Sequence, residues 1–178
     1  MEKDNKYFYV SYEKEIFDTL TLVKRIKESD WITSDTIIVN CNPNYSSIVT
    51  QILNHKLSHL NKNELFEVLN LNMPYPNMIQ VWDAEEQVYK QYIRYLADWI
   101  RRTISNSNKY LFLSSDSGTD SNFARLRTSM KGKIELDQYA FASVYLQENN
   151  YFTPDFYVEK FTDPIVYQWE NFNNPNWK

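Results

Sequence analysis

The chain has 178 residues, of which 43% are hydrophobic, so it is long and apolar enough to form an ordinary folded domain. Its net charge of −4 disfavours a nucleic-acid partner, and no run of about 18 apolar residues is present to span a membrane. The single cysteine, Cys41, forms no intrachain disulfide, and the charged first residues lead into no apolar signal segment. We therefore expect a cytoplasmic protein with one domain over residues 1–178.

The first half of the chain alternates between strand-like and helix-like segments. Four apolar residues near helical spacing, Ile16, Leu20, Val23 and Ile26, predict a helix that follows a short β-rich run. In chain order, the expected elements begin with a strand over 7–11, a helix over 12–28, a strand over 36–39 and a polar loop over 40–47. Ser46 or Ser47 of this loop is expected to cap a helix that carries residues 48–60. A short helix over 63–71 follows, and a strand over 78–82 comes after Pro74 and Pro76, which interrupt the pattern.

The second half contains the longest predicted helix, over 84–104. Asp83 caps it, acidic residues lie in its first turn, and Arg101 and Arg102 lie in its last, which is the charge order that complements the helix dipole. Its apolar stripe includes Tyr92, Tyr95 and Trp99. The expected elements that follow are a strand over 110–113, a helix over 121–130 and strands over 139–145, 156–158 and 165–167.

The order of these elements predicts the fold class and the place of a ligand. Strands that alternate with helices are typical of a three-layer α/β domain with a mostly parallel central sheet. Such sheets bind ligands at the carboxyl ends of their strands. The loops over 40–47, 114–121 and 146–154 are therefore the candidate sites.

The loop over 114–121 is the strongest of these candidates. It contains Gly118, one of only two glycines in the chain, between an apolar strand and a helix, a setting in which backbone N–H groups bind anions. It has no lysine and contains Asp116 and Asp120. The residues predicted to bind phosphate or ribose are Ser114, Ser115, Ser117, Gly118, Thr119 and Ser121. An ordinary turn with a helix cap, and a divalent-cation site at the two aspartates, are the alternatives.

Other residues with reactive or metal-binding side chains carry weaker signals. His55 and His59 are one helical turn apart, but no cysteine or His-Glu-x-x-His pattern accompanies them, so surface histidines are expected. Cys41 follows a strand, but the sequence places no base beside it, so a buried packing thiol is expected. No metal site is predicted from these residues.

Several segments together resemble the type I phosphoribosyltransferases, nearest the xanthine-guanine branch. Residues 9–12, 30–39 and 48–57 are similar to the opening of that family, and residues 154–159 and 165–170 are similar to its closing segment. The resemblance covers most of the chain except about 61–104 and rests on order and hydrophobic pattern. It implies a type I phosphoribosyltransferase-like fold.

The residues at the family's phosphoribosyl-diphosphate signature differ from the family pattern. The acidic pair that binds the ribose in the family falls on Ser114 and Ser115, and the Thr-Gly of its phosphate turn falls on Thr119 and Asp120. Serines bring no negative charge to a developing oxocarbenium centre. Asp120 repels a phosphate, at a cost of about 4 kcal/mol for charges about 4 Å apart at an effective dielectric constant of about 20.

Two further family motifs are also altered. The loop that grips the diphosphate in the family, usually Arg-Gly-Gly, corresponds to residues 40–47, where Asn42 and Asn44 flank Pro43 and neither glycine nor cation is present. The lysine that reads the purine in the family corresponds to Gln147. The resemblance implies that Tyr145 and Trp169 flank the base.

The segment over about 61–104 stands where the family has its flexible hood. A rigid amphipathic helix over 84–104 does not open and close like a mobile loop. We therefore expect a helical insertion that docks a second copy of the chain or a protein partner.

Two hypotheses for the function follow. In the first, the chain is a phosphoribosyltransferase-like protein without transferase activity, which binds a nucleotide or phosphate or acts as a protein-interaction module. In the second, it is a divergent, Mg²⁺-dependent purine phosphoribosyltransferase that uses phosphoribosyl diphosphate, with Asp116 or Asp120 in place of the lost acidic pair.

Overall fold

The computed structural model describes residues 7–71, 95–117 and 122–168. Within these ranges strands and helices alternate as expected. The elements in chain order are β1 (Phe8–Val10), α1 (Tyr12–Glu28), β2 (Thr36–Asn40), α2 (Pro43–Leu57), the 3-10 turn η1 (Ser58–Asn61), β3 (Val68–Asn70), a helical segment over 95–103, β4 (Lys109–Ser117), α4 (Asn122–Met130), the 3-10 turn η3 (Leu136–Gln138), β5 (Tyr139–Gln147), β6 (Phe156–Phe161) and β7 (Ile165–Tyr167).

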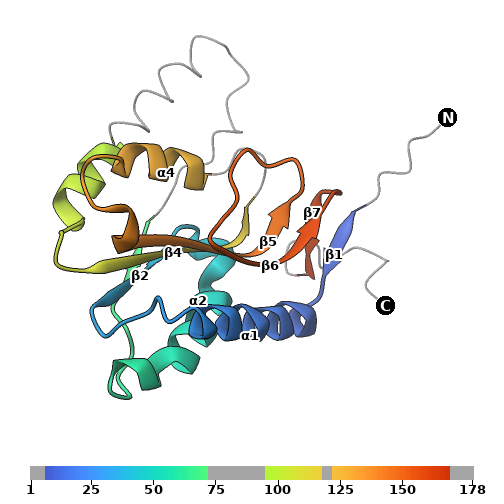
Figure 1. Ribbon diagram of the computed structural model, residues 1–178. Coiled ribbons are helices and arrows are strands. Elements are labelled where there is room, and N and C mark those ends of the chain that lie inside the picture. The colour runs from blue at the N-terminus through green and yellow to red at the C-terminus, as the bar shows by residue number, and fades with distance from the viewer. Residues whose placement is uncertain (1–6, 72–94, 118–121, 169–178) are drawn as a thin grey trace, which may run out of the picture.

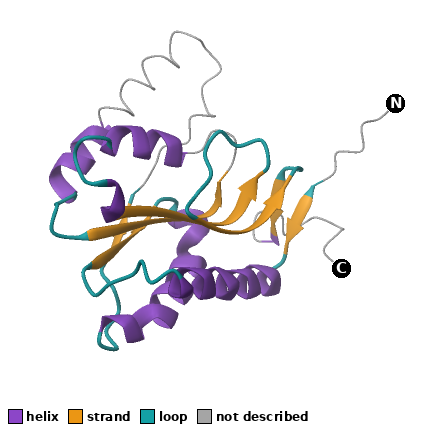
Figure 2. Cartoon of the chain, viewed as in Figure 1, coloured by secondary structure: helices purple, strands orange, loops and turns teal. Residues whose placement is uncertain are grey.

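The fold is a three-layer α/β arrangement around a parallel sheet, which confirms the predicted class. Five strands pair in the order β3-β2-β4-β5-β6, all parallel, and β1 and β7 form a separate parallel pair. Helices α1 and α2 cover one face of the sheet, and α4 and the 95–103 segment cover the other (Figures 1 and 2).

The two faces of the sheet are both apolar because successive side chains of a strand point to opposite sides. Ile38 and Leu111 face α1 and α2 in one core cluster, and Val39 and Phe112 face α4 in the other. The strand TIIVN of β2 is buried throughout, as expected for a central strand of a parallel sheet.

Local signals define α1 clearly, but the buried face differs from the predicted one. The Ser11 side chain accepts a hydrogen bond from the Lys14 N–H at 3.1 Å and caps the helix. Ile16 and Leu20, predicted to lie on the apolar stripe, are exposed to 44% and 39%. The buried face carries Glu15, Asp18, Thr19, Leu22, Val23 and Ile26.

The predicted helix over 63–71 is wrong, because this segment contains strand β3. Val68 pairs with Ile38 and Asn70 with Asn40, so β3 forms an edge of the sheet. Phe66 and Leu71, on either side of the strand, are buried. The strand is stabilised by long-range pairing with β2, which local spacing does not reveal.

Two predicted loops are shorter than expected. Helix α2 begins at Pro43 and not after Ser46 or Ser47, since proline suits the first turn of a helix, where its missing N–H has no partner to lose. Strand β4 continues to Ser117, so residues 114–117 belong to the strand. The predicted strand over 78–82 and most of the helix over 84–104 lie outside the described residues, and residues 95–103 are helical.

Candidate functional site

The carboxyl ends of β4 and β5 bring several predicted site residues together. Ser114 pairs with Ser143 and Asp116 with Tyr145, so the polar end of β4 lies beside the end of β5. Asn42 lies just before α2, at the end of the neighbouring strand β2, and Asn44 lies in the first turn of that helix. Gly118, Thr119, Asp120, Ser121 and Trp169 lie outside the described residues.

The serines of β4 are buried in the sheet. Ser114, Ser115 and Ser117 are exposed to 8% or less. The Asn150 side-chain amide donates hydrogen bonds to the Ser117 hydroxyl at 2.8 Å and to the Ser117 carbonyl at 2.9 Å. Asn150 in turn accepts a hydrogen bond from the Phe152 N–H at 3.0 Å, so the loop after β5 is fastened to the end of β4. The sequence predicts a candidate site in the loop over 146–154 that contains Asn150, but the role of Asn150 itself was missed.

Asp116 is held by a tyrosine from the second, smaller sheet. The Tyr167 hydroxyl donates a hydrogen bond to an Asp116 carboxylate oxygen at 3.1 Å. Tyr167 is buried, and burial, followed by the negative charge of Asp116, raises its pKa well above the ordinary value. The hydroxyl therefore stays protonated and remains a hydrogen-bond donor to Asp116.

Tyr145 belongs to a network of charged groups between β5 and α1. It is fully buried, and its hydroxyl donates to an Asp18 carboxylate oxygen at 2.9 Å. The Lys14 ammonium lies 2.9 Å from the same Asp18 oxygen and 2.6 Å from a Glu159 oxygen. Burial, followed by the hydrogen bond to Asp18, raises the pKa of Tyr145. Tyr145 therefore contacts α1, and its predicted contact with a purine stays a prediction.

Glu15 is the most unusual side chain near the end of β4. It is fully buried, and within the described ranges neither of its carboxylate oxygens has a partner at hydrogen-bonding distance and angle. Burial raises its pKa from the ordinary 4.5 to about 7; the nearby Ser115 side chain opposes the rise, and the negative charge of Asp116 adds to it. Glu15 therefore changes charge near neutral pH.

Glu15 and Asp18 were missed by sequence reasoning, although a signal was present. Asp18 lies one helical turn before Leu22, and Glu15 lies two turns before it, on the buried face of α1 that also carries Ile26. Reading the helical period from these buried positions, instead of from Ile16, would have placed both carboxyl groups against the sheet.

The segment predicted to replace the diphosphate loop is tied into the sheet and the start of α2. The Cys41 N–H donates to the Leu113 carbonyl at 2.8 Å, and the Asn42 N–H donates to the Asn40 side chain at 3.4 Å. The Ser46 hydroxyl lies within hydrogen-bonding reach of the Asn40 side-chain oxygen and of the Asn42 carbonyl. This segment is thus the N-terminus of a helix and not an open loop.

The positions of Cys41, His55 and His59 agree with a buried packing thiol and with surface histidines. Cys41 is buried, and burial raises the pKa of its thiol, so it is a packing thiol. His55 and His59 are exposed. Among the described residues no group of three or more His, Cys, Asp or Glu side chains is arranged to hold a metal ion. No described helix is long and apolar enough to cross a membrane.

Comparison with known proteins places the fold. No protein-family model matches the chain, and no curated protein resembles it in sequence. Similar solved structures include the Helicobacter pylori xanthine-guanine-hypoxanthine phosphoribosyltransferase (TM-score 0.58, 16% identity, 93% of each chain) and a purine phosphoribosyltransferase from Pyrococcus horikoshii (TM-score 0.59, 15% identity, 92% of this chain and 93% of that one).

A third similar structure is a hypothetical protein from Neisseria gonorrhoeae with bound ppGpp (TM-score 0.57, 11% identity, 97% of this chain and 93% of that one). Together with the parallel sheet and its flanking helices, these likenesses confirm the fold predicted from the resemblance. The chain has a type I phosphoribosyltransferase-like fold.

Proposed function

We propose that this chain is a phosphoribosyltransferase-fold protein that binds a nucleotide or another phosphorylated ligand at the carboxyl end of β4 and does not transfer phosphoribose. The observation that carries the proposal is the start of α2. The segment after β2, where the family holds diphosphate, contains Asn40, Asn42 and Ser46 hydrogen-bonded to one another. It contains neither a glycine nor a cation to bind diphosphate.

The end of β4 supports the same conclusion. Ser114 and Ser115 stand where the family has its acidic pair, and both are buried neutral hydroxyls. They supply no negative charge to a ribose centre that becomes positive during transfer. Asp116, the nearest described carboxylate of this strand, accepts a hydrogen bond from Tyr167.

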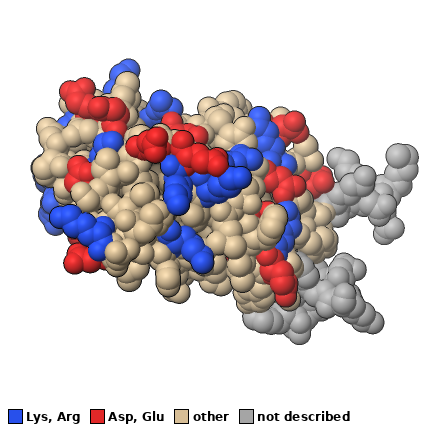
Figure 3. All heavy atoms as spheres, turned by 60° about the horizontal axis from the view of Figure 1, so that its bottom comes forward, with Lys and Arg blue, Asp and Glu red and all other residues tan. Residues whose placement is uncertain are grey.

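The similar solved structures support a nucleotide as the class of ligand. Two of them are purine phosphoribosyltransferases by name, and the third contains bound ppGpp. The charge of the surface disfavours an extended polyanion, such as a nucleic acid, as the ligand. Figure 3 shows acidic and basic side chains interspersed over the face that carries α1, and the chain has a net charge of −4.

A divergent, Mg²⁺-dependent purine phosphoribosyltransferase is the second candidate function. The observation in its favour is that Asp116 and Glu15 interact electrostatically beside Ser115, so two carboxyl groups lie near the position of the lost acidic pair. In this candidate Asp116 or Asp120 would hold Mg²⁺, Gln147 would read the base, and Tyr145 and Trp169 would flank it.

One substitution, Asp116→Asn, separates the two functions. Asparagine still accepts the hydrogen bond from Tyr167 but removes a negative charge near the predicted phosphate site. If the chain only binds, calorimetry with GMP and with ppGpp will show tighter binding to the variant, by roughly tenfold for about 1.4 kcal/mol of relieved repulsion. Asp30→Asn, at an exposed position after α1 that lies outside both candidate sites and whose positive φ asparagine tolerates, is the matched control.

The enzyme assay completes the test. We expect no turnover when wild-type protein is mixed with phosphoribosyl diphosphate, Mg²⁺ and hypoxanthine, guanine, xanthine or adenine. Turnover that disappears in Asp116→Asn would establish the second function. If neither GMP nor ppGpp gives any heat, the binding proposal is wrong and a protein-interaction role is left.

We also propose that the helix over 84–104 docks a second copy of the chain or a protein partner. In its described part Leu96 and Ile100 are buried in the core, and Tyr95 is 44% exposed. Gel filtration with light scattering measures the mass in solution. A strict monomer at micromolar concentration would remove the dimer.

A further inference from the structure

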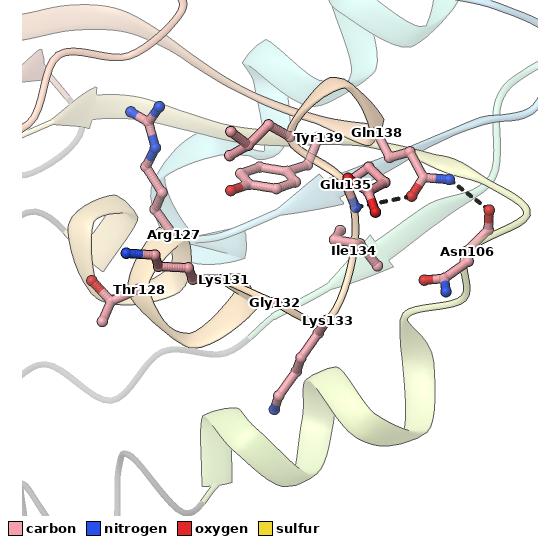
Figure 4. Close-up of a pocket in the computed structure, with 11 residues that line it drawn as sticks. Asn106, Arg127, Thr128, Lys131, Gly132, Lys133, Ile134, Glu135, Gln138 and Tyr139 are labelled. Carbon is pink, nitrogen blue, oxygen red and sulfur yellow. Dashed lines mark hydrogen bonds between the residues drawn. The ribbon is translucent and has the colours of Figure 1, made fainter.

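A second concave site lies at the opposite end of the sheet from the predicted phosphate loop. It is a pocket of about 1020 Å³ between the end of α4, the following turn and the start of β5 (Figure 4). Tyr139 is the first residue of β5 and Asn106 lies just before β4, so the pocket adjoins the amino ends of both strands. A volume of this size accommodates a nucleotide-sized ligand.

The charged residues that line the pocket are mainly cations, and no described carboxylate neutralises them by an ion pair. Arg127, Lys131 and Lys133 line it, and within the described part of the chain none of the three forms an ion pair. Glu135 is the single acidic residue in the lining. Three cations and one carboxylate leave two net positive charges, in a chain whose total charge is −4.

The sequence concentrates these cations in one segment. No acidic residue occurs between Asp120 and Glu135, whereas this stretch contains Arg125 in addition to the three cations of the pocket. The turn between Lys131 and Lys133 is made by Gly132 at φ +77°, a left-handed conformation that glycine adopts without strain.

The helix dipole accounts for only part of this charge. A cation near the C-terminus of α4 is favourable, and Arg127 lies in the last turn of that helix. Lys131 and Lys133 follow the helix, and their N–H groups donate to the Arg127 and Met130 carbonyls at 3.2 Å and 2.9 Å. These two carbonyls are thereby satisfied by backbone donors, so the two ammonium groups are not required to cap them and remain available to another anion.

The walls of the pocket are fixed and offer a further donor. The Arg127 guanidinium lies 5.5 Å from the centre of the Phe152 ring, an arrangement that restrains it. The Gln138 side chain bridges the Asn106 carbonyl and the Glu135 N–H at 2.5 Å and 3.1 Å. The Tyr139 hydroxyl has no hydrogen-bond partner among the described residues and is free to donate to a ligand.

We propose that this pocket binds a small ligand with two or more phosphate groups, such as a nucleoside diphosphate, and that its phosphates draw in the cationic side chains of Arg127, Lys131 and Lys133, which point in different directions without a ligand (Figure 4). Two net positive charges in a concave, nucleotide-sized site favour a compact multivalent anion. An extended polyanion such as a nucleic acid is disfavoured because it would also meet the negative charge of the rest of the chain.

The two glycines of the chain allow a direct test. In protein labelled with ¹⁵N-glycine, NMR shows one amide signal from Gly132, in this pocket, and one from Gly118, in the loop predicted to bind phosphate. Gly132→Ala removes one signal and so assigns both. Titration with ADP, and separately with pyrophosphate, is expected to shift the Gly132 signal in a saturable way.

Charge reversal then tests which residues bind. Lys131→Glu with Lys133→Glu is expected to weaken the titration of Gly132 by about tenfold or more for each lysine. Lys27→Glu with Lys56→Glu is the matched control, because these exposed lysines also lie at helix C-termini, those of α1 and α2. The control is expected to titrate like the wild type.

The response of Gly132 tests this pocket separately from the site at the carboxyl end of β4, which is tested by Asp116→Asn. A shift of Gly132 by either probe, abolished only in the pocket variant, supports the proposal whether or not Gly118 also moves. The proposal is overturned if Gly132 does not respond to millimolar ADP or pyrophosphate, or if the pocket variant and the control titrate alike.

Discussion

Replacing Glu15 with glutamine tests whether the carboxyl group buried between α1 and β4 limits the stability of the protein at neutral and alkaline pH. Glu15 is fully buried, and within the described ranges its carboxylate oxygens have no hydrogen-bond partner. Burial raises its pKa from 4.5 to about 7. Glutamine has nearly the same shape and never carries the charge.

The magnitude follows from linkage between protonation and folding. The folded state holds the Glu15 proton more tightly than the unfolded state, so stability is highest below pH 4.5 and falls as the pH rises through about 7. Each pKa unit corresponds to about 1.4 kcal/mol, so ionised Glu15 costs the folded protein up to about 3 kcal/mol at pH 8.5. The Glu15→Gln variant escapes this cost.

Urea unfolding at pH 5.0, 7.0 and 8.5 measures the effect. We expect Glu15→Gln to be more stable than wild type by about 2 to 3 kcal/mol at pH 8.5 and by less than about 1 kcal/mol at pH 5.0. Glu13→Gln, at an exposed position in the first turn of the same helix, controls for the loss of an acidic residue near the helix N-terminus. If wild type and Glu15→Gln have parallel stability curves from pH 5.0 to 8.5, the carboxylate is solvated and the reasoning is refuted.

Three other substitutions test the contacts around the sheet. Tyr145→Phe removes the hydroxyl that donates to Asp18 and is expected to lower the free energy of unfolding by about 1 to 2 kcal/mol, measured in urea. Asn150→Ala releases the end of β4 at Ser117 and is expected to cost a similar 1 to 2 kcal/mol, or about 2 to 8 °C in melting temperature for a chain of this length. Gly132→Ala meets no atom within 4 Å, so its cost of about 1 kcal/mol comes from the positive φ alone.

Each of these predictions has a result that would contradict it, and Tyr151→Phe is the control for Tyr145→Phe. Tyr151→Phe, at a residue that is 97% exposed, should leave the unfolding curve unchanged. A Tyr145→Phe protein as stable as wild type would show that Asp18 is satisfied without the tyrosine. An unchanged melting temperature in Asn150→Ala would mean that the loop after β5 does not stabilise the end of β4. Asparagine tolerates a positive φ, so a Gly132→Asn variant as unstable as Gly132→Ala would contradict the explanation by backbone conformation.

The fold class could be predicted because its signals are local. The helix α1 begins after a serine cap and ends near basic residues, and its predicted bounds, 12–28, are those observed. The run over 36–39 is short and wholly apolar, which is typical of a buried parallel strand, and it is the core of β2. The order of strands and helices, with the resemblance to phosphoribosyltransferases, was then enough to predict a three-layer parallel fold.

The predictions fail where the structure of a segment is decided by pairing with a distant strand or by contacts at the start of a helix. The sequence over 63–71 predicts a short helix, but pairing of Val68 with Ile38 makes Val68–Asn70 an edge strand. Pro43 was expected in a loop, although proline is equally compatible with the first turn of α2. In both cases the local pattern fits two structures, and contacts with distant residues select one.

The candidate site divides in the same way. The sequence by itself determined that Ser114, Ser115 and Asp116 follow an apolar strand and lie at the carboxyl-end edge of the sheet. The continuation of β4 through these residues, beside β5, was decided by the tertiary structure. Only the tertiary structure decided that α1 turns Glu15 and Asp18 inward and leaves Ile16 and Leu20 exposed. The physical reason is that Asp18 meets the Tyr145 hydroxyl and the Lys14 ammonium, and burial of Asp18 turns the same helix face, with Glu15, toward the polar end of β4. Such neighbours are identified by position in space and not by spacing along the chain.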